Sequence, residues 1–214
     1  MSRTACSLAH RVTGVARGRC VLATLIVSLV AASLGRAAGP AGLEQTLLAA
    51  SVLVGSGCSG VLVDGPDLVL TAEHCVTGSA THVLRFSDGS ERTGWVAGVD
   101  HDADQALLLL EKPVVLAPLA LVRQPPIAGT VLYFAGNPRT PRFQEAKLER
   151  TGRCPSLPAL GTALFTTIKG VPGDSGAPIV DAGTRVVGLV HGGAQCQIAT
   201  PSDTLRRLIA DVLR

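Results

Sequence analysis

The chain has 214 residues, of which 47% are apolar and 24 are glycine, so it can form one large or two small cores and lacks the composition of a disordered protein. Its formal charge of +3 comes from the first 37 residues, which hold five arginines and no acid. Removing those five from the 19 basic side chains leaves 14 against 16 acidic ones, a balance of −2. This balance excludes the basic surface that binds nucleic acid or an anionic membrane.

Residues 1–37 are predicted to be a secretory signal peptide. Residues 1–20 are polar and carry arginine, residues 21–34 are almost wholly apolar, and residues 35–37 offer small side chains for cleavage. The apolar run is shorter than the roughly 20 residues of a membrane-spanning helix. We expect an exported protein, secreted or held in the periplasm or cell envelope, with no membrane attachment after cleavage.

Residues 38–50 are expected to form an N-terminal spacer, followed by a first set of strands in residues 51–122. Short apolar runs alternate with turn residues, which predicts an antiparallel barrel or sandwich. The runs are Ser51–Val54, Gly60–Val63, Asp67–Leu70, Val83–Phe86, Trp95–Val99 and Leu107–Leu110.

A proline-containing linker around residues 111–130 leads to a second set of strands, which we place in residues 123–201. Residues 202–214 begin with a serine suited to helix capping and carry an apolar stripe at the spacing of a packed C-terminal helix. The apolar runs are Thr130–Ala135, Gln144–Arg150, Ala163–Ile168, Ala177–Val180 and Arg185–Val190, and the stripe is Leu205, Leu208, Ile209 and Val212.

Three polar residues in these segments are candidates for nucleophilic catalysis. Ser175 lies in residues 173–178 (Gly-Asp-Ser-Gly-Ala-Pro), whose glycines allow a sharp turn that could aim the amides of Gly173 and Ser175 at one point. A serine hydroxyl needs a base, and His74 stands at the end of an apolar strand. Asp104 opens another apolar run and can orient that base. Taken alone, the glycine-rich stretch is equally consistent with a turn between strands.

The chain order of histidine, aspartate and serine excludes two other classes of serine hydrolase. An α/β-hydrolase has the order serine, acid, histidine, with glycines two residues before and after the serine, and position 177 is alanine. A Gly-Asp-Ser esterase would carry its serine near the start of the chain and its histidine near the end. This chain has the reverse order.

The residues around all three side chains resemble the chymotrypsin-like (trypsin-fold) serine proteases, in particular the compact bacterial secreted members. Residues 71–75 (Thr-Ala-Glu-His-Cys) are similar to the family's Thr-Ala-Ala-His-Cys, and residues 104–107 (Asp-Gln-Ala-Leu) to its Asp-Ile-Ala-Leu. Residues 173–178 are similar to its Gly-Asp-Ser-Gly-Gly-Pro. The resemblance runs from about residue 51 to the C-terminus.

This resemblance implies His74 as general base, Asp104 as the acid that orients it, and Ser175 as nucleophile, with the amides of Gly173 and Ser175 as the oxyanion hole. The fold it implies is all-β: two antiparallel β-barrels packed face to face, with a C-terminal α-helix. His74 and Asp104 would lie on the first barrel and Ser175 on the second, in a cleft between them.

Several positions depart from the family's pattern. Glu73 replaces a small residue beside the base, where its carboxylate would raise the basicity of the histidine or point to solvent. Ala177 replaces a glycine, and His191 stands where the family has serine near the catalytic acid. Asp102 is an alternative catalytic acid, and the polar cluster of residues 100–104 is a candidate metal site or a polar loop. No Ile-Val-Gly-Gly terminus is present, so we do not expect activation by its insertion.

Four cysteines remain after removal of the signal peptide, and export makes disulfides the expected state. The family has a bridge that corresponds to Cys58 and Cys75. This leaves Cys154 and Cys196 as a second pair, which matches no family bridge. The spacings include no Cys-x-x-Cys pair, so we do not expect zinc.

The resemblance also indicates which residues bind the substrate. Lys169, six residues before the serine, corresponds to the floor of the specificity pocket, and His191, Gly192 and Gly193 to its wall. A lysine and a histidine in one pocket would favour cleavage after Glu or Asp. The alternative is a solvated surface lysine and a histidine that fills the place next to Asp104.

The sequence therefore predicts a secreted serine endopeptidase that acts on polypeptides through an acyl-enzyme, as a monomer. Proton transfer and oxyanion stabilisation need only protein groups, so no cofactor or metal is expected. The alternative is a trypsin-like module that has lost catalysis and binds peptides or proteins.

Overall fold

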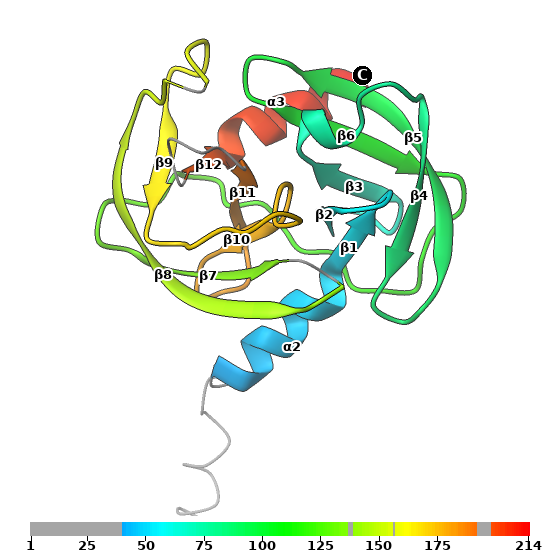
Figure 1. Ribbon diagram of the computed structural model, residues 1–214, viewed down its shortest axis with the longest axis horizontal. Helices are drawn as coiled ribbons and strands as arrows, with labels where there is room; N and C mark the ends of the chain where they lie inside the picture. The colour runs from blue at the N-terminus through cyan, green and yellow to red at the C-terminus, as the bar shows by residue number, and fades with distance from the viewer. Residues whose placement is uncertain (1–39, 137–138, 156, 192–197) are drawn as a thin grey trace, which may run out of the picture. The chain divides into compact units, whose positions relative to one another are not determined.

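Twelve strands form two closed antiparallel barrels of six strands each, with one helix before the first barrel and another after the second (Figure 1). The structure is a computed structural model that describes residues 40–136, 139–155, 157–191 and 198–214. The expected signal peptide lies outside the described residues. The predicted all-β fold of two barrels and a C-terminal helix is confirmed.

The first barrel has the strand order β1-β2-β3-β6-β5-β4, and pairing of β1 with β4 closes it. Its strands are rich in Val and Leu, and side chains such as Val69 and Leu108 are fully buried in the barrel interior. The strands are β1 (Ser51–Val54), β2 (Cys58–Leu62), β3 (Leu68–Thr71), β4 (Thr81–Phe86), β5 (Glu91–Asp100) and β6 (Gln105–Leu110).

The second barrel has the order β10-β11-β12-β9-β8-β7 and its own buried core, which includes Leu132 and Phe134. One of its strands, β12, was not among the predicted apolar runs, because its four residues, Ile-Ala-Thr-Pro, form no continuous apolar run. β12 pairs with both β9 and β11 and so completes the closed barrel. The strands are β7 (Val131–Gly136), β8 (Arg142–Gly152), β9 (Ala163–Thr166), β10 (Pro178–Val180), β11 (Val186–His191) and β12 (Ile198–Pro201).

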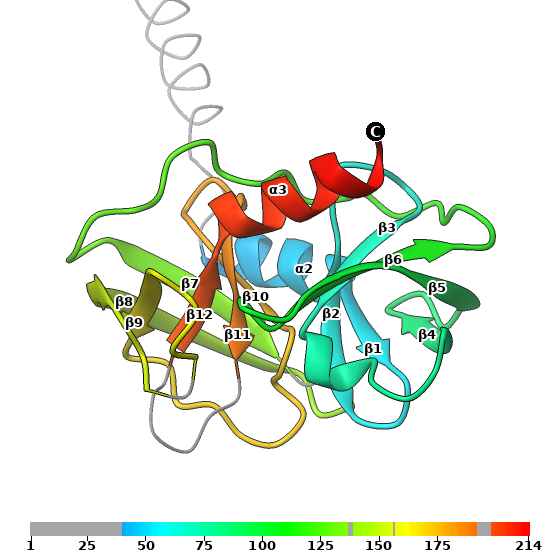
Figure 2. The same ribbon diagram turned by 90° about the horizontal axis from the view of Figure 1, so that it is seen from above.

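A third buried cluster joins the two barrels and both helices. Helix α2 (Pro40–Ala50) buries Leu43 and Leu47 in it, together with Leu70 of β3 and Leu189 of β11. Figure 2 shows α2 and α3 beside the strands of both barrels. Residues 40–50 of the expected spacer are therefore a helix that packs into the core, while residues 38–39 lie outside the described range. Because both barrels share this cluster, they are held in a fixed relation to each other.

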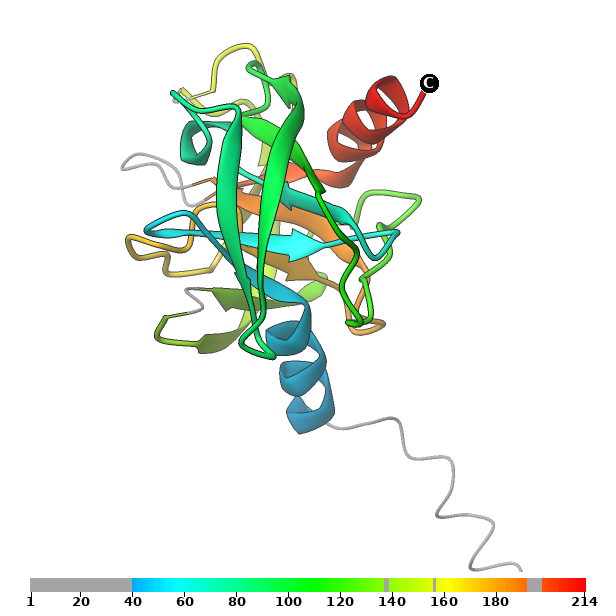
Figure 3. The same ribbon diagram turned by 90° about the vertical axis from the view of Figure 1, so that its right-hand side faces the viewer.

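Helix α3 (Ser202–Val212) packs the predicted stripe, with Leu205, Leu208 and Ile209 buried. Ser202 does not cap it: the residue before the helix is Pro201, and the Ser202 hydroxyl donates to the Val122 carbonyl at 3.5 Å. Figure 3 shows α3 and α2 on opposite sides of the strands. Neither described helix is long and apolar enough to cross a membrane.

Candidate active site

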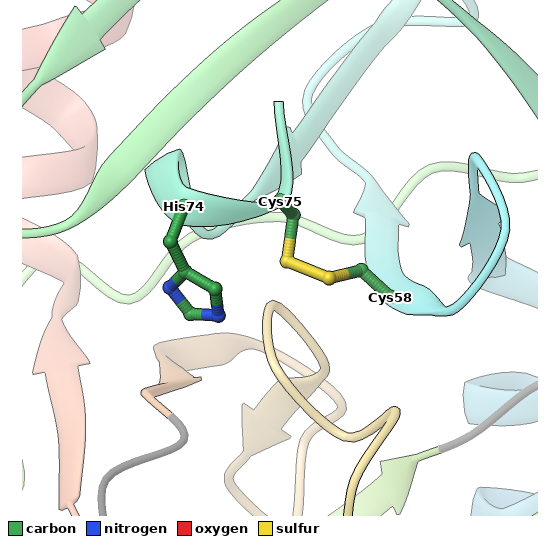
Figure 4. Close-up of side chains that lie close together, drawn as sticks. All are labelled: Cys58, His74 and Cys75. Carbon is green, nitrogen blue, oxygen red and sulfur yellow. A yellow bond between two sulfur atoms is a disulfide. The ribbon is translucent and has the colours of Figure 1, made fainter. Parts of the chain in front are cut away.

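His74 lies in η1 (Glu73–Cys75), a single 3-10 turn that follows the buried strand β3. The next residue, Cys75, forms a disulfide with Cys58 at the start of β2, with 5.9 Å between their Cα atoms. Figure 4 shows the His74 ring and the Cys75 sulfur leaving the same turn. The predicted bridge is confirmed, and it fixes the turn that carries the histidine to the neighbouring strand.

Asp104 faces His74 from the end of the loop before β6. Its Oδ2 is 2.8 Å and its Oδ1 3.0 Å from Nδ1 of the His74 ring, and Oδ1 also accepts the backbone amide of His74 at 2.9 Å. Asp104 is 6% exposed, whereas Asp102, the alternative acid, is exposed. Because Nδ1 faces the acid, Nε2 is the ring nitrogen left for a substrate or a nucleophile.

This contact shifts the pKa values of both groups. Hydrogen bonding to Asp104 raises the pKa of His74 above its usual 6.5 against the opposing effect of burial, and the charges of Asp104 and Glu73 add to the rise. Burial alone would raise the pKa of Asp104, but hydrogen bonds from His191 and His74 outweigh it and hold that pKa well below its usual range. Asp104 is therefore ionised at neutral pH and favours the protonated form of His74.

His191, the last residue of β11, also contacts Asp104 through its Nδ1 and the Oδ2 atom of the carboxylate. The His74 and His191 rings are 5.9 Å apart between centroids and nearly perpendicular. His191 thus occupies the place next to Asp104. Of the other proposed pocket residues, Lys169 is exposed, and its backbone forms hydrogen bonds with the side chain of Gln144. Gly192 and Gly193 lie outside the described residues.

The loop that carries Ser175 comes from the second barrel but is bonded to the first. The Ser59 amide donates to the Ser175 carbonyl at 2.8 Å, and the Ser59 hydroxyl donates to the Gly173 carbonyl at 2.6 Å. Gly176 has φ +82°, and a Cβ there would lie 2.2 Å from the Ser59 carbonyl oxygen, so this close approach requires glycine. The Ser175 carbonyl is 3.9 Å from the sulfur of Cys75, the residue after His74.

Two backbone amides in this loop have no acceptor among the described residues: those of Gly173 and Ser175. The amide of Asp174, between them, donates to the Val171 carbonyl, and that of Gly176 donates to the Val190 carbonyl. Unpaired, fixed amides of the nucleophile itself and of the residue two before it are the donors that an oxyanion needs. Within the described chain, no hydrogen bond joins the Ser175 hydroxyl to the His74 ring, and such bonds are often long before substrate binds.

The Ser175 loop is also held by an ion pair between Asp174 and Arg142, which the sequence did not indicate. Asp174 is 1% exposed, and its Oδ2 accepts Nη1 of Arg142 at 3.0 Å and the Val171 amide at 2.8 Å. Burial raises the pKa of Asp174, and Arg142 and the Val171 amide oppose that rise. Arg142 lies 32 residues away on β8 and has no local motif. Only the acidic residue inside the loop signals that a counter-ion is needed.

The remaining sequence predictions concern a second disulfide and the polar loop. Cys154 is buried and disulfide-bonded, but Cys196 lies outside the described residues, so their pairing stays a prediction. Glu73 is largely buried, and its Oε1 lies 3.3 Å from Nδ1 of the exposed His101.

Two six-stranded barrels, with a bonded histidine and aspartate on the first and a serine loop from the second, define the chymotrypsin-like class of serine proteases. Residues 58–189 match the family described as "Trypsin-like peptidase domain", and the chain belongs to that family. No curated protein sequence matches the chain significantly.

Solved structures show the same fold. An HtrA-type protease, AlgW, solved with a tripeptide has a TM-score of 0.71 and 20% identity, with 81% of this chain and 63% of that one covered. The Rv3671c protease in an inactive form has a TM-score of 0.65 and 20% identity, with 79% and 92% covered. A serine endoprotease from Yersinia pestis has a TM-score of 0.68 and 18% identity, with 80% and 65% covered. The chain thus spans less than two thirds of the length of the first and third.

Proposed function

We propose that this chain hydrolyses peptide bonds in polypeptide substrates, with His74, Asp104 and Ser175 as its catalytic residues. The observation that supports this most strongly is the bonded His74–Asp104 pair beside a serine loop with two unpaired amides. Arg142 supplies a counter-ion to Asp174 inside the serine loop.

In this mechanism, Nε2 of His74 takes the proton of the Ser175 hydroxyl as the oxygen attacks the substrate carbonyl. Asp104 stays ionised and stabilises the imidazolium that forms. The amides of Gly173 and Ser175 hold the oxyanion, and His74 then gives its proton to the leaving amine. Water, activated by the same nitrogen, hydrolyses the acyl-enzyme and restores the serine.

Covalent labelling tests this assignment. A fluorophosphonate probe should label the folded protein at Ser175, and either Ser175→Ala or His74→Ala should abolish labelling and peptide hydrolysis. The exposed Ser87→Ala is the matched control and should label normally. A folded protein that is not labelled would instead indicate a silent module that binds peptides or proteins.

The finer proposal on specificity is a preference for Glu or Asp before the scissile bond. Lys169 is its remaining basis, because His191 contacts Asp104. Peptides that differ only at the residue before the cut test it, with Lys169→Met as the variant that should lose the preference. Faster cleavage after small apolar or basic residues would refute it.

We also propose that the protein is exported and acts as a monomer. The apolar run of residues 21–34 and the Cys58–Cys75 disulfide support export. N-terminal sequencing of the secreted product would identify the cleavage site, and sedimentation would measure its mass. Retention of the whole chain in the cytoplasm would contradict the proposal.

A further inference from the structure

Three side chains of the kinds that bind metal ions lie together in the candidate active site. The Nδ1 atoms of His74 and His191 both face Oδ2 of Asp104, and the three groups lie within 4.8 Å of one another. We propose that His74, Asp104 and His191 bind Zn²⁺, and that the bound ion switches off the peptidase. The second half of this proposal rests on the proposed function, whereas the binding itself does not.

The donor set suits zinc. Two imidazole nitrogens and a carboxylate are common zinc ligands in proteins. The two oxygens of Asp104 are already divided: the backbone amide of His74 holds Oδ1, while Oδ2 faces both rings. Oδ2 can therefore bind an ion while Oδ1 keeps the carboxylate in place.

Only a small movement is needed to admit the ion. Ligand atoms at the usual zinc distance of about 2.1 Å lie roughly 3.4 Å apart around a tetrahedral ion. Nδ1 of His74 is now 2.8 Å from Oδ2 and Nδ1 of His191 is closer still, so each ring nitrogen must move away from Oδ2 by about 1 Å or less. His74 is 43% exposed and can tilt, whereas His191 is 11% exposed. Solvent on the exposed side supplies the fourth ligand.

Zinc at this point would disable the base by holding its ring in a different tautomer. Each neutral ring moves its single proton from Nδ1 to Nε2, and the freed Nδ1 lone pair binds the ion, while Asp104 is already ionised. The proton on Nε2 of His74 then occupies the lone pair that must accept the Ser175 proton. A histidine in the wrong tautomer cannot act as the general base.

The described residues contain one other group with suitable ligands, Cys58, His74 and Cys75. Its two sulfurs are joined in a disulfide and cannot bind the ion as thiolates. The nearby His101 is exposed and faces Glu73 instead of Asp104, so it serves as the matched control histidine.

Binding is tested first without activity, in tag-free protein carrying Ser175→Ala. Co²⁺ should give visible absorption bands of a low-coordinate site at one equivalent, and Zn²⁺ should displace it. Adding His191→Ser should weaken binding by at least about 100-fold, more than the effect of changing a group that only orients a ligand. Adding His101→Asn should leave binding unchanged. Equal affinity with and without His191, or no binding at all, overturns the site.

A second measurement does not depend on a variant that might misfold. In ¹⁵N-labelled Ser175→Ala protein, Zn²⁺ should move the ring nitrogen signals of His74 and His191 and leave those of His82 and His101 in place. Shifts confined to His82 or His101 would overturn the proposal.

Inhibition is then measured in the active protein. Zn²⁺ should lower kcat, and EDTA should restore it. Half-inhibition of the His191→Ser variant, measured against its own metal-free rate, should need at least about 100-fold more Zn²⁺ than half-inhibition of the unchanged protein. If the protein binds Zn²⁺ but has no activity, the zinc site is supported and the proposed peptidase function is refuted. If the protein is fully active but does not bind Zn²⁺, the peptidase function is supported and the zinc site is refuted.

Discussion

Replacing Arg142 with methionine would leave a buried carboxylate without its counter-ion. Asp174 is 1% exposed, and in the variant its Oδ2 would keep only the Val171 amide, since Oδ1 has no partner among the described residues. Methionine keeps an unbranched stem of similar length, so the change removes mainly the charge and the Nη2 bond to the Lys169 carbonyl. We expect a less stable protein and a distorted Ser175 loop.

The size of the loss follows from the burial. Removing one partner of a buried ion pair costs about 3–5 kcal/mol. The variant can limit this cost if Asp174 becomes protonated. Protonating a carboxyl with the ordinary pKa of about 3.9 costs about 1.4 kcal/mol for each pH unit above that pKa, which is about 4 kcal/mol at neutral pH. We therefore expect a loss of up to about 4 kcal/mol at neutral pH. A displacement of the loop by about 1 Å would lower kcat/KM by about 100-fold.

The loss should depend on pH with a defined sign. The folded-state pKa of Asp174 is raised, so the native protein binds more protons than the unfolded chain and the free energy of unfolding falls as pH rises through that range. Removing Arg142 raises this pKa further. The deficit of the variant is thus largest at neutral pH and shrinks as the solution becomes acidic. Asp104 has a lowered pKa, so its contribution to stability is lost on acidification. Because this loss is the same in both proteins, it cancels in the difference between their free energies of unfolding.

Urea unfolding of both proteins at several pH values, with the disulfides intact, measures this difference. Asp174→Asn, alone and combined with Arg142→Met, is the control because it removes the charge and keeps the shape. When Asp174→Asn is already present, the Arg142 substitution should cost much less. A deficit that is the same at every pH, or unchanged by the control, would show that Arg142 acts through packing alone and would refute the reasoning.

Three further predictions test the geometry around the serine loop. Gly176→Ala should destabilise the protein by more than about 1 kcal/mol and abolish hydrolysis, because φ is +82° and the added Cβ would meet a carbonyl of β2. The control Gly78→Ala, with φ +84° in open space, should cost only the backbone strain. Equal melting temperatures of the two variants would contradict this prediction. The kcat/KM of the enzyme should fall on acidification through the raised pKa of His74, so an acid limb below 6.5 in the pH profile would be evidence against the Asp104 contact. Replacing Cys58 and Cys75 together with alanine should lower the free energy of unfolding by about 3 kcal/mol, since the bridge closes a 17-residue separation, and an unchanged urea midpoint would show that it does not constrain the chain.

Helix α2 and strand β12 were both missed from the sequence, for different reasons. Leu43 and Leu47 have the i, i+4 spacing of a helix face, but one turn of spacing in an 11-residue segment is a weak signal. β12 is short, and its residues, Ile-Ala-Thr-Pro, form no continuous apolar run. It is a strand because β9 and β11 lie on either side of it and supply its hydrogen bonds.

The sequence by itself determined the two sets of strands, the helix stripe, and His74, Asp104 and Ser175 in their order, because strand periodicity and catalytic motifs are properties of short segments. The family resemblance placed His191 near Asp104, but only the tertiary structure decided that Arg142 faces Asp174, that His191 contacts the Asp104 carboxylate across 87 residues, and that Ser59 holds the serine loop across 114 residues. Those contacts depend on how two closed barrels pack on their shared core. No local pattern records which side chains such packing brings together, and the zinc site proposed at His191 follows from that packing alone.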